Sequence, residues 1–457
     1  MTRSTTTEHR SASSPVPDRP VDSVLGAPSR GTGLSRRGLL RRAGLAAGAA
    51  LPLLGLAATT TPARADVPTP APAPGPDPDQ LFQDGDLTAA EYAYARLLRA
   101  DPGNAHAAAQ LGYLCLLSDR LTPAGRLLRE ALRLDPGDDD AKRHLSQCYL
   151  RQNLPAPAGP LLPPPEAARQ AALTGTPYEI RGAQSTRVPF LALDPLPQVS
   201  ASVNGGASGR FVLDTGAADL TLTTDMAQRL GLKPVAMSQG MIADRTVTTY
   251  LGVASSLRLG GIEVRNVPVT WIDGGILAFP DGTVTDGTIG MSVFYRFITT
   301  LDYARQALVL RRKNTAQQRA LRTEAARAGL HPQPLWLADH LPCTPAVLNG
   351  YGPRIATMDT GGAGAGVNTS PDNAARAAMA VDWSHPTPIN GGAVTVYPAT
   401  VDRVALGAAV AHHVPASVGP TPWEGMTRFS TIGNITHEFY KPFAVTFDFA
   451  TMRLYIG

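Results

Sequence analysis

The chain contains Phe211-Val212-Leu213-Asp214-Thr215-Gly216-Ala217, and a similar stretch, Ile355-Ala356-Thr357-Met358-Asp359-Thr360-Gly361-Gly362, follows later in the sequence. In each stretch an apolar run typical of a buried strand ends directly in Asp-Thr-Gly. One Asp-Thr-Gly would carry little information, because these are ordinary turn residues. Two copies at the ends of similar strands indicate that one unit has been duplicated in tandem.

Further landmarks repeat at nearly the same spacing as the two Asp-Thr-Gly motifs. The turn pair Asn204-Gly205, typical of a β-hairpin, recurs as Asn349-Gly350. Thr288-Ile289-Gly290 recurs as Thr431-Ile432-Gly433. Each copy reads as short strands separated by turns, and we therefore expect a mainly β architecture for the second part of the chain.

These motifs together resemble the retropepsin-like and pepsin-like aspartic proteases. The resemblance covers about residues 185–457. It implies a bilobal pepsin-like double β-barrel, with lobes at 166–312 and 313–457 that meet about a pseudo-twofold axis. It also implies that Asp214 and Asp359 form a catalytic dyad, one from each lobe.

Two carboxylates in contact suit peptide hydrolysis, because the reaction needs a base to activate water and an acid to protonate the leaving amine. Like charges so close do not ionise together, so the pair shares one proton. The resemblance further implies that the threonines hydrogen-bond across the lobe interface and that the glycines let the backbone approach the carboxylates. The supporting residues on this interpretation are Thr215, Gly216, Ala217, Thr360, Gly361, Gly362, Gly290 and Gly433.

The two copies differ after the glycine, where one has Ala217 and the other Gly362. Neither residue has a hydroxyl group. Since a hydrogen bond to a carboxylate favours its charged form, we expect the missing hydroxyl to give a pH optimum milder than that of a pepsin. Gly362 also predicts a less constrained second loop.

The family covers its cleft with a β-hairpin flap. In the first copy the candidate is 236–250, with Tyr250 as the flap aromatic, and in the second copy it is the turn Asn390-Gly391-Gly392. Both lobes are candidates for supplying the flap. Tyr250 has a second interpretation as an ordinary packing residue of a strand.

Residues 1–65 read as an export signal. Ser35-Arg36-Arg37-Gly38-Leu39-Leu40 precedes the apolar run 43–58, and Ala63-Arg64-Ala65 follows as a small-x-small cleavage site. The paired arginines resemble a twin-arginine signal. The apolar run is shorter than the ~20 residues that span a bilayer, which disfavours a membrane anchor. We expect a mature protein without a stable membrane span, either periplasmic or secreted.

The segment 66–165 is expected to hold a linker and helical repeats. Leu98-Arg99-Ala100-Asp101-Pro102-Gly103 recurs as Leu132-Arg133-Leu134-Asp135-Pro136-Gly137. This spacing is typical of helix-turn-helix repeats, and the pattern over 79–150 resembles the tetratricopeptide family. So few repeats serve either as a brace packed on the next domain or as a groove for a protein partner. The run 155–165 is expected to be a proline-rich linker that ends any helix.

Charge and motifs exclude other classes of protein. Of the 457 residues, the first 65 hold nine arginines and three acidic residues, so the formal charge of +4 becomes about −2 for the remainder, and no basic field for nucleic acid is left. Cys115, Cys148 and Cys343 are too few for a disulfide scaffold or a zinc site, although a Cys115–Cys148 bridge is compatible with export. No Gly-x-Ser-x-Gly, phosphate-binding loop or His-Glu-x-x-His occurs, so we expect neither a metal nor another cofactor.

The sequence therefore predicts an exported aspartic endopeptidase that acts on polypeptides as a single-chain, monomeric catalytic unit. The alternative is a non-catalytic cell-envelope binding or assembly module, in which the helical repeats recruit a protein partner and turnover has been lost. Gly362 and the appended repeats motivate this alternative, whereas the retention of both aspartates argues against it. A third arrangement, in which each lobe pairs with a lobe of another chain, also stays open.

Overall fold

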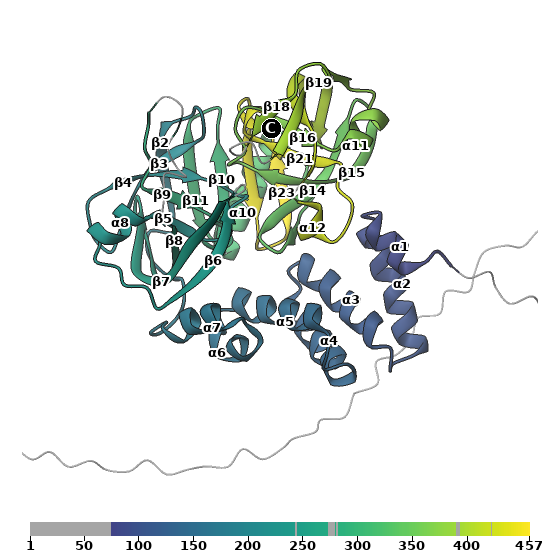
Figure 1. Cartoon of the computed structure of the whole chain (residues 1–457), viewed down its shortest axis with the longest axis horizontal. Coiled ribbons are helices and arrows are strands. Elements are labelled where there is room, and N and C mark those ends of the chain that lie inside the picture. Colours follow the sequence, from purple (N-terminus) through teal and green to yellow (C-terminus); the bar gives the residue numbers. More distant parts are fainter. Residues whose placement is uncertain (1–74, 243–244, 273–278, 280–281, 390–393, 422) are drawn as a thin grey trace, which may run out of the picture. The chain divides into compact units, whose positions relative to one another are not determined.

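The computed structural model describes residues 75–242, 245–272, 279, 282–389, 394–421 and 423–457 (Figure 1). The described residues from 75 onward belong to one compact unit. The predicted signal peptide, 1–65, lies outside the described residues. In the part of the chain that the structure describes, no helix is both long and apolar enough to cross a membrane.

The first part of this unit is helical, and its helices repeat in pairs. They are α1 (Pro78–Gln83), α2 (Leu87–Ala100), α3 (Ala105–Leu117), α4 (Leu121–Leu134) and α5 (Asp139–Arg151). The pair α2 and α3 recurs as α4 and α5, at the spacing of the repeated sequence motif. The side chains of Asp86, Asn104 and Asp138 accept a backbone N–H in the first turn of α2, α3 and α5, which satisfies donors that a helix end leaves free.

The predicted proline-rich linker at 155–165 is wrong, because this stretch is helical. It forms α6 (Pro155–Ala158), a short 3-10 helix η1 (Gly159–Leu161) and the start of α7 (Pro164–Ala171). Pro155 and Pro164 stand at the first position of their helices, where the missing N–H would have no partner in any case. The helical part therefore continues to Ala171, past the predicted boundary at 165.

The remainder is mainly β and falls into two halves. The N-half contains β1 (Glu179–Gly182), β2 (Ser185–Ala192), β3 (Gln198–Val203), β4 (Gly209–Leu213), β5 (Leu220–Thr223), α8 (Thr224–Arg229), β6 (Ala236–Ile242), β7 (Arg245–Leu259), β8 (Ile262–Ile272), β9 (Gly287–Ile289), α9 (Met291–Phe294), β10 (Phe297–Asp302) and β11 (Ala307–Arg312). The C-half contains α10 (Thr315–Arg327), β12 (Gln333–Pro334), β13 (Trp336–Ala338), β14 (Leu341–Leu348), β15 (Tyr351–Asp359), β16 (Val367–Thr369), α11 (Pro371–Arg376), β17 (Ala380–Val381), β18 (Thr387–Ile389), β19 (Val394–Leu406), β20 (Ala409–Val418), α12 (Glu424–Thr427), β21 (Gly433–Thr436), α13 (His437–Tyr440), β22 (Ala444–Asp448) and β23 (Arg453–Ile456).

The two halves share one strand order. The N-half runs β3-β4-β9-β5-β8-β7-β6, and the C-half runs β14-β15-β21-β16-β20-β19, with β18 paired to β19. The strand directions also correspond. β4 is parallel to β9 as β15 is to β21, and β5 is parallel to β8 as β16 is to β20. The duplication visible in the sequence is therefore present in the topology.

A six-stranded sheet joins the halves in the order β12-β23-β22-β10-β11-β2. At its centre β10 and β22, the corresponding strands of the two halves, pair antiparallel. Thr300 and Thr446 lie opposite each other there, and their hydroxyl groups are 2.8 Å apart. Because each threonine meets its own counterpart, the pair marks the local twofold axis that relates the two halves.

The predicted match of Thr288-Ile289-Gly290 with Thr431-Ile432-Gly433 is wrong by three positions. Ile289 pairs with Leu213, but Leu213 corresponds to Met358, whose partner is Ile435. Strand pairing thus aligns Gly433 with Gly287 and places Thr436 where the N-half has Gly290. The two apolar-apolar-Gly motifs are similar in sequence but do not occupy equivalent positions in the paired strands.

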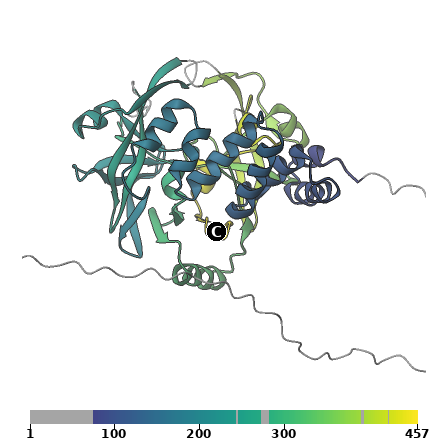
Figure 2. The same ribbon diagram turned by 90° about the horizontal axis from the view of Figure 1, so that it is seen from below.

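The helical part packs on both halves of the β structure (Figure 2). Buried side chains of the helices, Phe82 and Tyr113 among them, form one cluster with Cys343, Ile355 and Phe429 of the C-half. Part of the helical surface is thereby buried against the chain's own β structure. All three cysteines are buried and unbridged.

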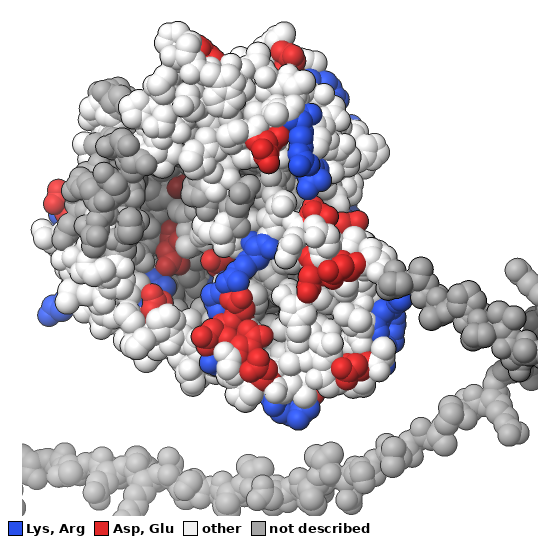
Figure 3. Space-filling model, turned by 45° about the vertical axis from the view of Figure 1, so that its right-hand side comes forward, with Lys and Arg blue, Asp and Glu red and all other residues white. Residues whose placement is uncertain are grey.

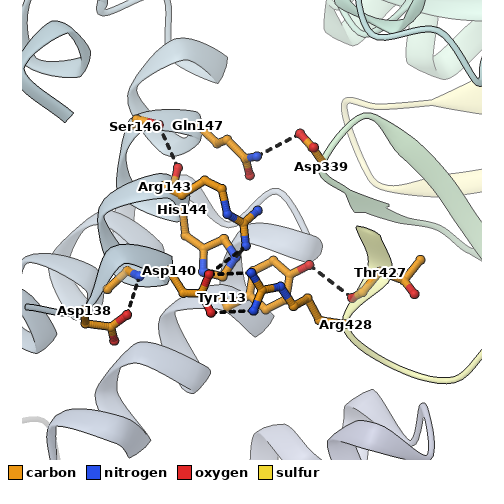
Figure 4. A network of polar contacts seen from close by, with 11 residues as sticks. Tyr113, Asp138, Asp140, Arg143, His144, Ser146, Gln147, Asp339, Thr427 and Arg428 are labelled. Carbon is orange, nitrogen blue, oxygen red and sulfur yellow. Dashed lines mark hydrogen bonds and ion pairs between the residues drawn. The ribbon is translucent and has the colours of Figure 1, made fainter. Parts of the chain in front are cut away.

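Polar contacts reinforce this packing at the C-half (Figure 4). Arg428 forms a bidentate ion pair with Asp140 at 2.5 Å, and Gln147 donates to Asp339 at 2.8 Å. Tyr113 donates its hydroxyl to the carbonyl of residue 427. Each contact joins α3 or α5 to α12 or to a loop of the C-half, so specific polar pairs as well as apolar burial hold the helical part there.

The described surface carries both signs of charge. On the face that Figure 3 shows, basic and acidic side chains are interspersed, and much of the surface between them is uncharged. Neither sign forms a continuous field on that face. This distribution agrees with the near-neutral charge of the chain beyond residue 65.

Candidate active site

The two Asp-Thr-Gly loops meet between the halves and bond to each other through their threonines. The backbone N–H of Thr215 donates to the Thr360 hydroxyl at 3.0 Å, and the N–H of Thr360 donates to the Thr215 hydroxyl at 3.0 Å. Each hydroxyl in turn donates to a carbonyl of the opposite strand, at Met358 and at Leu213. Both threonines are fully buried, so these four hydrogen bonds fix the loops against each other in a dry environment.

The glycines bring the two carboxyl groups together. A Cβ built on Gly216 would lie 2.5 Å from an Asp359 oxygen, and one built on Gly361 would lie 2.2 Å from the Asp214 carboxyl carbon. Each aspartate therefore rests against the glycine of the other loop. No side chain fits at either position, which is the physical reason for glycine there.

The contact perturbs the ionisation of Asp214. Burial, followed by the neighbouring charge of Asp359, raises the pKa of Asp214 well above its usual range. Backbone N–H groups of Gly216 and Ala217 oppose the shift, because they donate to Asp214 Oδ1 at 2.7 and 3.1 Å. The pair is therefore arranged to share a proton near neutral pH rather than to carry two charges.

Asp359 has a different set of hydrogen-bond donors. Its Oδ1 accepts from the backbone N–H of Gly361 at 2.9 Å, and its Oδ2 accepts from the side-chain amide of Asn434 at 3.1 Å. Asn434 is not among the site residues predicted from the sequence. Its signal was its place directly after Gly433, in the strand that runs beside Asp359.

The presence of glycine at position 362 is explained by its contact with Thr436. A Cβ on Gly362 would lie 2.6 Å from the Thr436 methyl group, so a larger residue would clash. The loop is also held by the backbone, since His437 N–H donates to the carbonyl of Gly362 at 3.2 Å. The expected lack of constraint at Gly362 is thus offset by packing from α13 and the end of β21.

The predicted supporting glycines divide between two roles. Gly290 lies against the first loop, where an added Cβ would be 2.4 Å from the carbonyl of Asp219. Gly433 instead lies against β16, where its Cβ would be 2.7 Å from the carbonyl of Asn368. Gly433 therefore does not support the Asp359 loop in the way the resemblance implied.

Both halves have a hairpin at the predicted flap position. In the N-half β6 and β7 pair up to Ile242 and Arg245, and in the C-half β18 and β19 pair up to Ile389 and Val394. The turns at 243–244 and 390–393 lie outside the described residues. Tyr250 stacks on Trp271 with ring centroids 5.8 Å apart, which is the contact of a packing residue.

A cavity of about 170 Å³ adjoins the first loop and is walled partly by the helical part. Its lining includes Leu154 and Arg169 from the helices and Asp219 from the loop. Arg169 forms a largely buried ion pair with Asp219 at 2.7 Å. His340, also in the lining, approaches the carbonyl of Gly216 at 3.0 Å, and although burial opposes protonation, Asp339 raises its pKa. The sequence around His340 contains no motif that would predict its position beside the first Asp-Thr-Gly loop.

Asp194, His437 and Glu438 bring three potential metal-ligating atoms within 4.8 Å of one another. The Lys441 ammonium lies 2.5 Å from Asp194 and 2.8 Å from Glu438. Both carboxylates thus share one lysine as their ion-pair partner. The group serves as an ion-pair cluster at the start of α13.

Comparisons with known proteins match the part of the chain that contains the first Asp-Thr-Gly loop. A family model described as aspartyl protease matches residues 199–293, which include Asp214 and Gly290. Among solved structures, a retropepsin-like aspartic protease from Rickettsia conorii is similar at 22% sequence identity, over 29% of this chain and 92% of that one, with a TM-score of 0.21. No curated protein matches. The N-half is therefore similar to the aspartyl protease family.

Proposed function

We propose that this protein is an aspartic endopeptidase with a bilobal, pepsin-like catalytic unit in which Asp214 and Asp359 activate the hydrolytic water. One observation carries the proposal. Each carboxylate packs against the glycine of the opposite loop, so two carboxyl groups share one buried position between the halves. The family match to the N-half supports a peptidase.

The reaction follows from one shared proton. The ionised carboxylate takes a proton from water as the water oxygen bonds to the peptide carbonyl carbon, and the neutral carboxyl gives its proton to the carbonyl oxygen. In the second step the C–N bond breaks, the proton taken from water passes to the leaving nitrogen, and a diol hydroxyl returns a proton to the other carboxyl. Water is consumed, an acid and an amine are released, and the dyad regains its starting state.

The remaining assignments belong to the same proposal. The chemistry is complete with two carboxyl groups and water, so it calls for no cofactor. The substrate is a polypeptide, and because both loops come from one chain, a monomer holds the whole dyad. The twin-arginine pattern at 35–40 supports export to the periplasm or outside the cell.

The proposal is tested with the purified chain lacking residues 1–65 and a mixed pool of unfolded peptides, from about pH 3 to pH 8. We expect cleavage by the unaltered protein and a loss of about 100- to 10,000-fold in Asp214→Asn and in Asp359→Asn, because asparagine keeps the shape and removes the acid-base chemistry. Equal cleavage by either variant would refute the shared dyad. Tight peptide binding without cleavage would instead favour the non-catalytic binding module.

A further inference from the structure

We propose that Asn434 is a positioning residue that makes the two aspartates unequal, so that Asp359 is the ionised base and Asp214 keeps the shared proton. The inference rests on the proposed peptidase function and adds to it an assignment of the two roles. It follows from how Asn434 is oriented, from what stands at the same place in the N-half and from the burial of the two carboxyl groups.

The side-chain amide of Asn434 has a polar partner at each end. Its Nδ2 is 3.1 Å from Asp359 Oδ2, and its Oδ1 accepts a hydrogen bond from the Thr357 hydroxyl at 2.8 Å. Asn434 and Thr357 are fully buried. An amide NH₂ group only donates and an ionised carboxylate only accepts, so this orientation suits an ionised Asp359.

The N-half lacks this arrangement. Strand pairing sets Val212 beside Thr288 where the C-half sets Thr357 beside Asn434. The backbone hydrogen bonds to Asp214 both reach the same oxygen, Oδ1. Asp359, by contrast, has a donor on each oxygen. Donors of this kind favour the charged form of a carboxyl group.

Burial alone would predict the opposite assignment. Asp359 is only 6% exposed, whereas Asp214 is half-buried, and the more buried carboxyl group would ordinarily stay neutral. The buried amide of Asn434 compensates for that cost at Asp359.

The other ionisable groups around the pair do not compete for the assignment. Burial raises the pKa of the Tyr303 and Tyr440 phenols well above their ordinary value, so both stay neutral. Burial lowers the pKa of His437, beside the second loop, which leaves it neutral at neutral pH. His340 contacts the carbonyl of Gly216 rather than a carboxyl group. The amide is thus the polar side chain that distinguishes the two aspartates.

The assignment gives each aspartate one task in bond cleavage. Asp359 takes the proton of the attacking water, and Asp214 protonates the carbonyl oxygen. As the C–N bond breaks, Asp359 gives its new proton to the leaving nitrogen and Asp214 recovers one from the diol.

The test is the pH profile of kcat/KM for Asn434→Leu, which keeps the branching of the side chain, is somewhat larger and lacks the donor. We expect the acid limb to move to higher pH by about one unit and the rate on that limb to fall about 10-fold. Thr357→Val, which frees the amide, should move the limb in the same direction by less. Thr288→Val, at the matching place in the N-half, is the control and should leave the limb unchanged.

Three results would overturn the proposal. A uniform loss of rate in Asn434→Leu with an unmoved acid limb would show a structural role alone. If Asn434→Leu does not fold, an unmoved limb in Thr357→Val decides against it. An equal shift in Thr288→Val would remove the distinction between the halves. The dyad itself is judged separately, since Asp214→Asn and Asp359→Asn report on the peptidase function whatever the limb does.

Discussion

The loops around Asp214 and Asp359 share one topology, but the larger side chain stands at a different position in each half. The N-half combines Ala217 with Gly290, whereas the C-half combines Gly362 with Thr436 at the corresponding places. In each half one member of the pair is glycine, and it lies against the backbone or side chain of the other. The space behind each of the two aspartates is therefore shared by two loops, and a residue in either loop can fill it.

The largest effect should come from the contact that both halves share. Gly216→Ala and Gly361→Ala each push a methyl group into the opposite carboxyl, and we expect kcat to fall at least about 100-fold in both, since a displacement of about 1 Å is enough for that loss. Gly159→Ala is the control, because its Cβ would meet open space. A tolerated Gly361→Ala would show that the halves do not hold their carboxyl groups equally tightly.

The next effect separates the halves. Gly362→Ala clashes with Thr436 and should lower the free energy of unfolding by about 1 to 3 kcal/mol, measured by chemical denaturation. Adding Thr436→Ser removes the methyl group and keeps the hydroxyl that donates to the carbonyl of Ala365. The double variant should recover about 0.5 to 1 kcal/mol relative to additivity. Strict additivity would contradict the exchange of volume between the two loops.

A third experiment uses pH. The pKa of Asp214 is raised on folding, so its contribution to stability is full below the unfolded value and is lost as the pH rises through the folded value. Asp214→Asn removes this dependence. The variant should gain about 1 to 2 kcal/mol over the unaltered protein between about pH 4 and pH 8. Parallel stability curves for the two proteins would contradict the raised pKa.

The smallest effect should fall where the halves are equal. Thr300→Val and Thr446→Val each remove one partner of the hydroxyl pair on the local axis, and both should cost about 1 kcal/mol of unfolding free energy. The double variant leaves no unpaired hydroxyl and should cost less than the two single changes together. Clearly different single values, measured by thermal unfolding, would show that the symmetry fails even at the axis.

The sequence was sufficient for features that depend on local patterns. The apolar strands ending in Asp-Thr-Gly, the hairpins near 236–250 and 390–392 and the helical repeat marked by 98–103 and 132–137 follow from residue types and spacing alone. Strand and helix periodicity depend on the order of residues along the chain, so they can be predicted from a single sequence.

Features that depend on tertiary contacts were not recoverable. The repeated apolar-apolar-Gly motif predicts that Gly433 corresponds to Gly290. Strand pairing shows instead that Thr436 stands at that place, and this pairing cannot be deduced from a three-residue motif. Asn434 has no local signature, since its role exists only where Asp359 lies beside it. The prolines at 155 and 164 predict the end of a helix by their residue type, whereas in the structure each stands at the first position of a helix, where proline is favoured.

The joining of both copies in a single chain has a consequence for how such a site can evolve. A dimer of identical subunits cannot place an amide beside one aspartate without placing it beside both, because every substitution appears twice. In this chain the two corresponding positions hold Asn434 in one copy and Thr288 in the other. Two copies within a single chain thus allow the proposed acid and base to be modified separately.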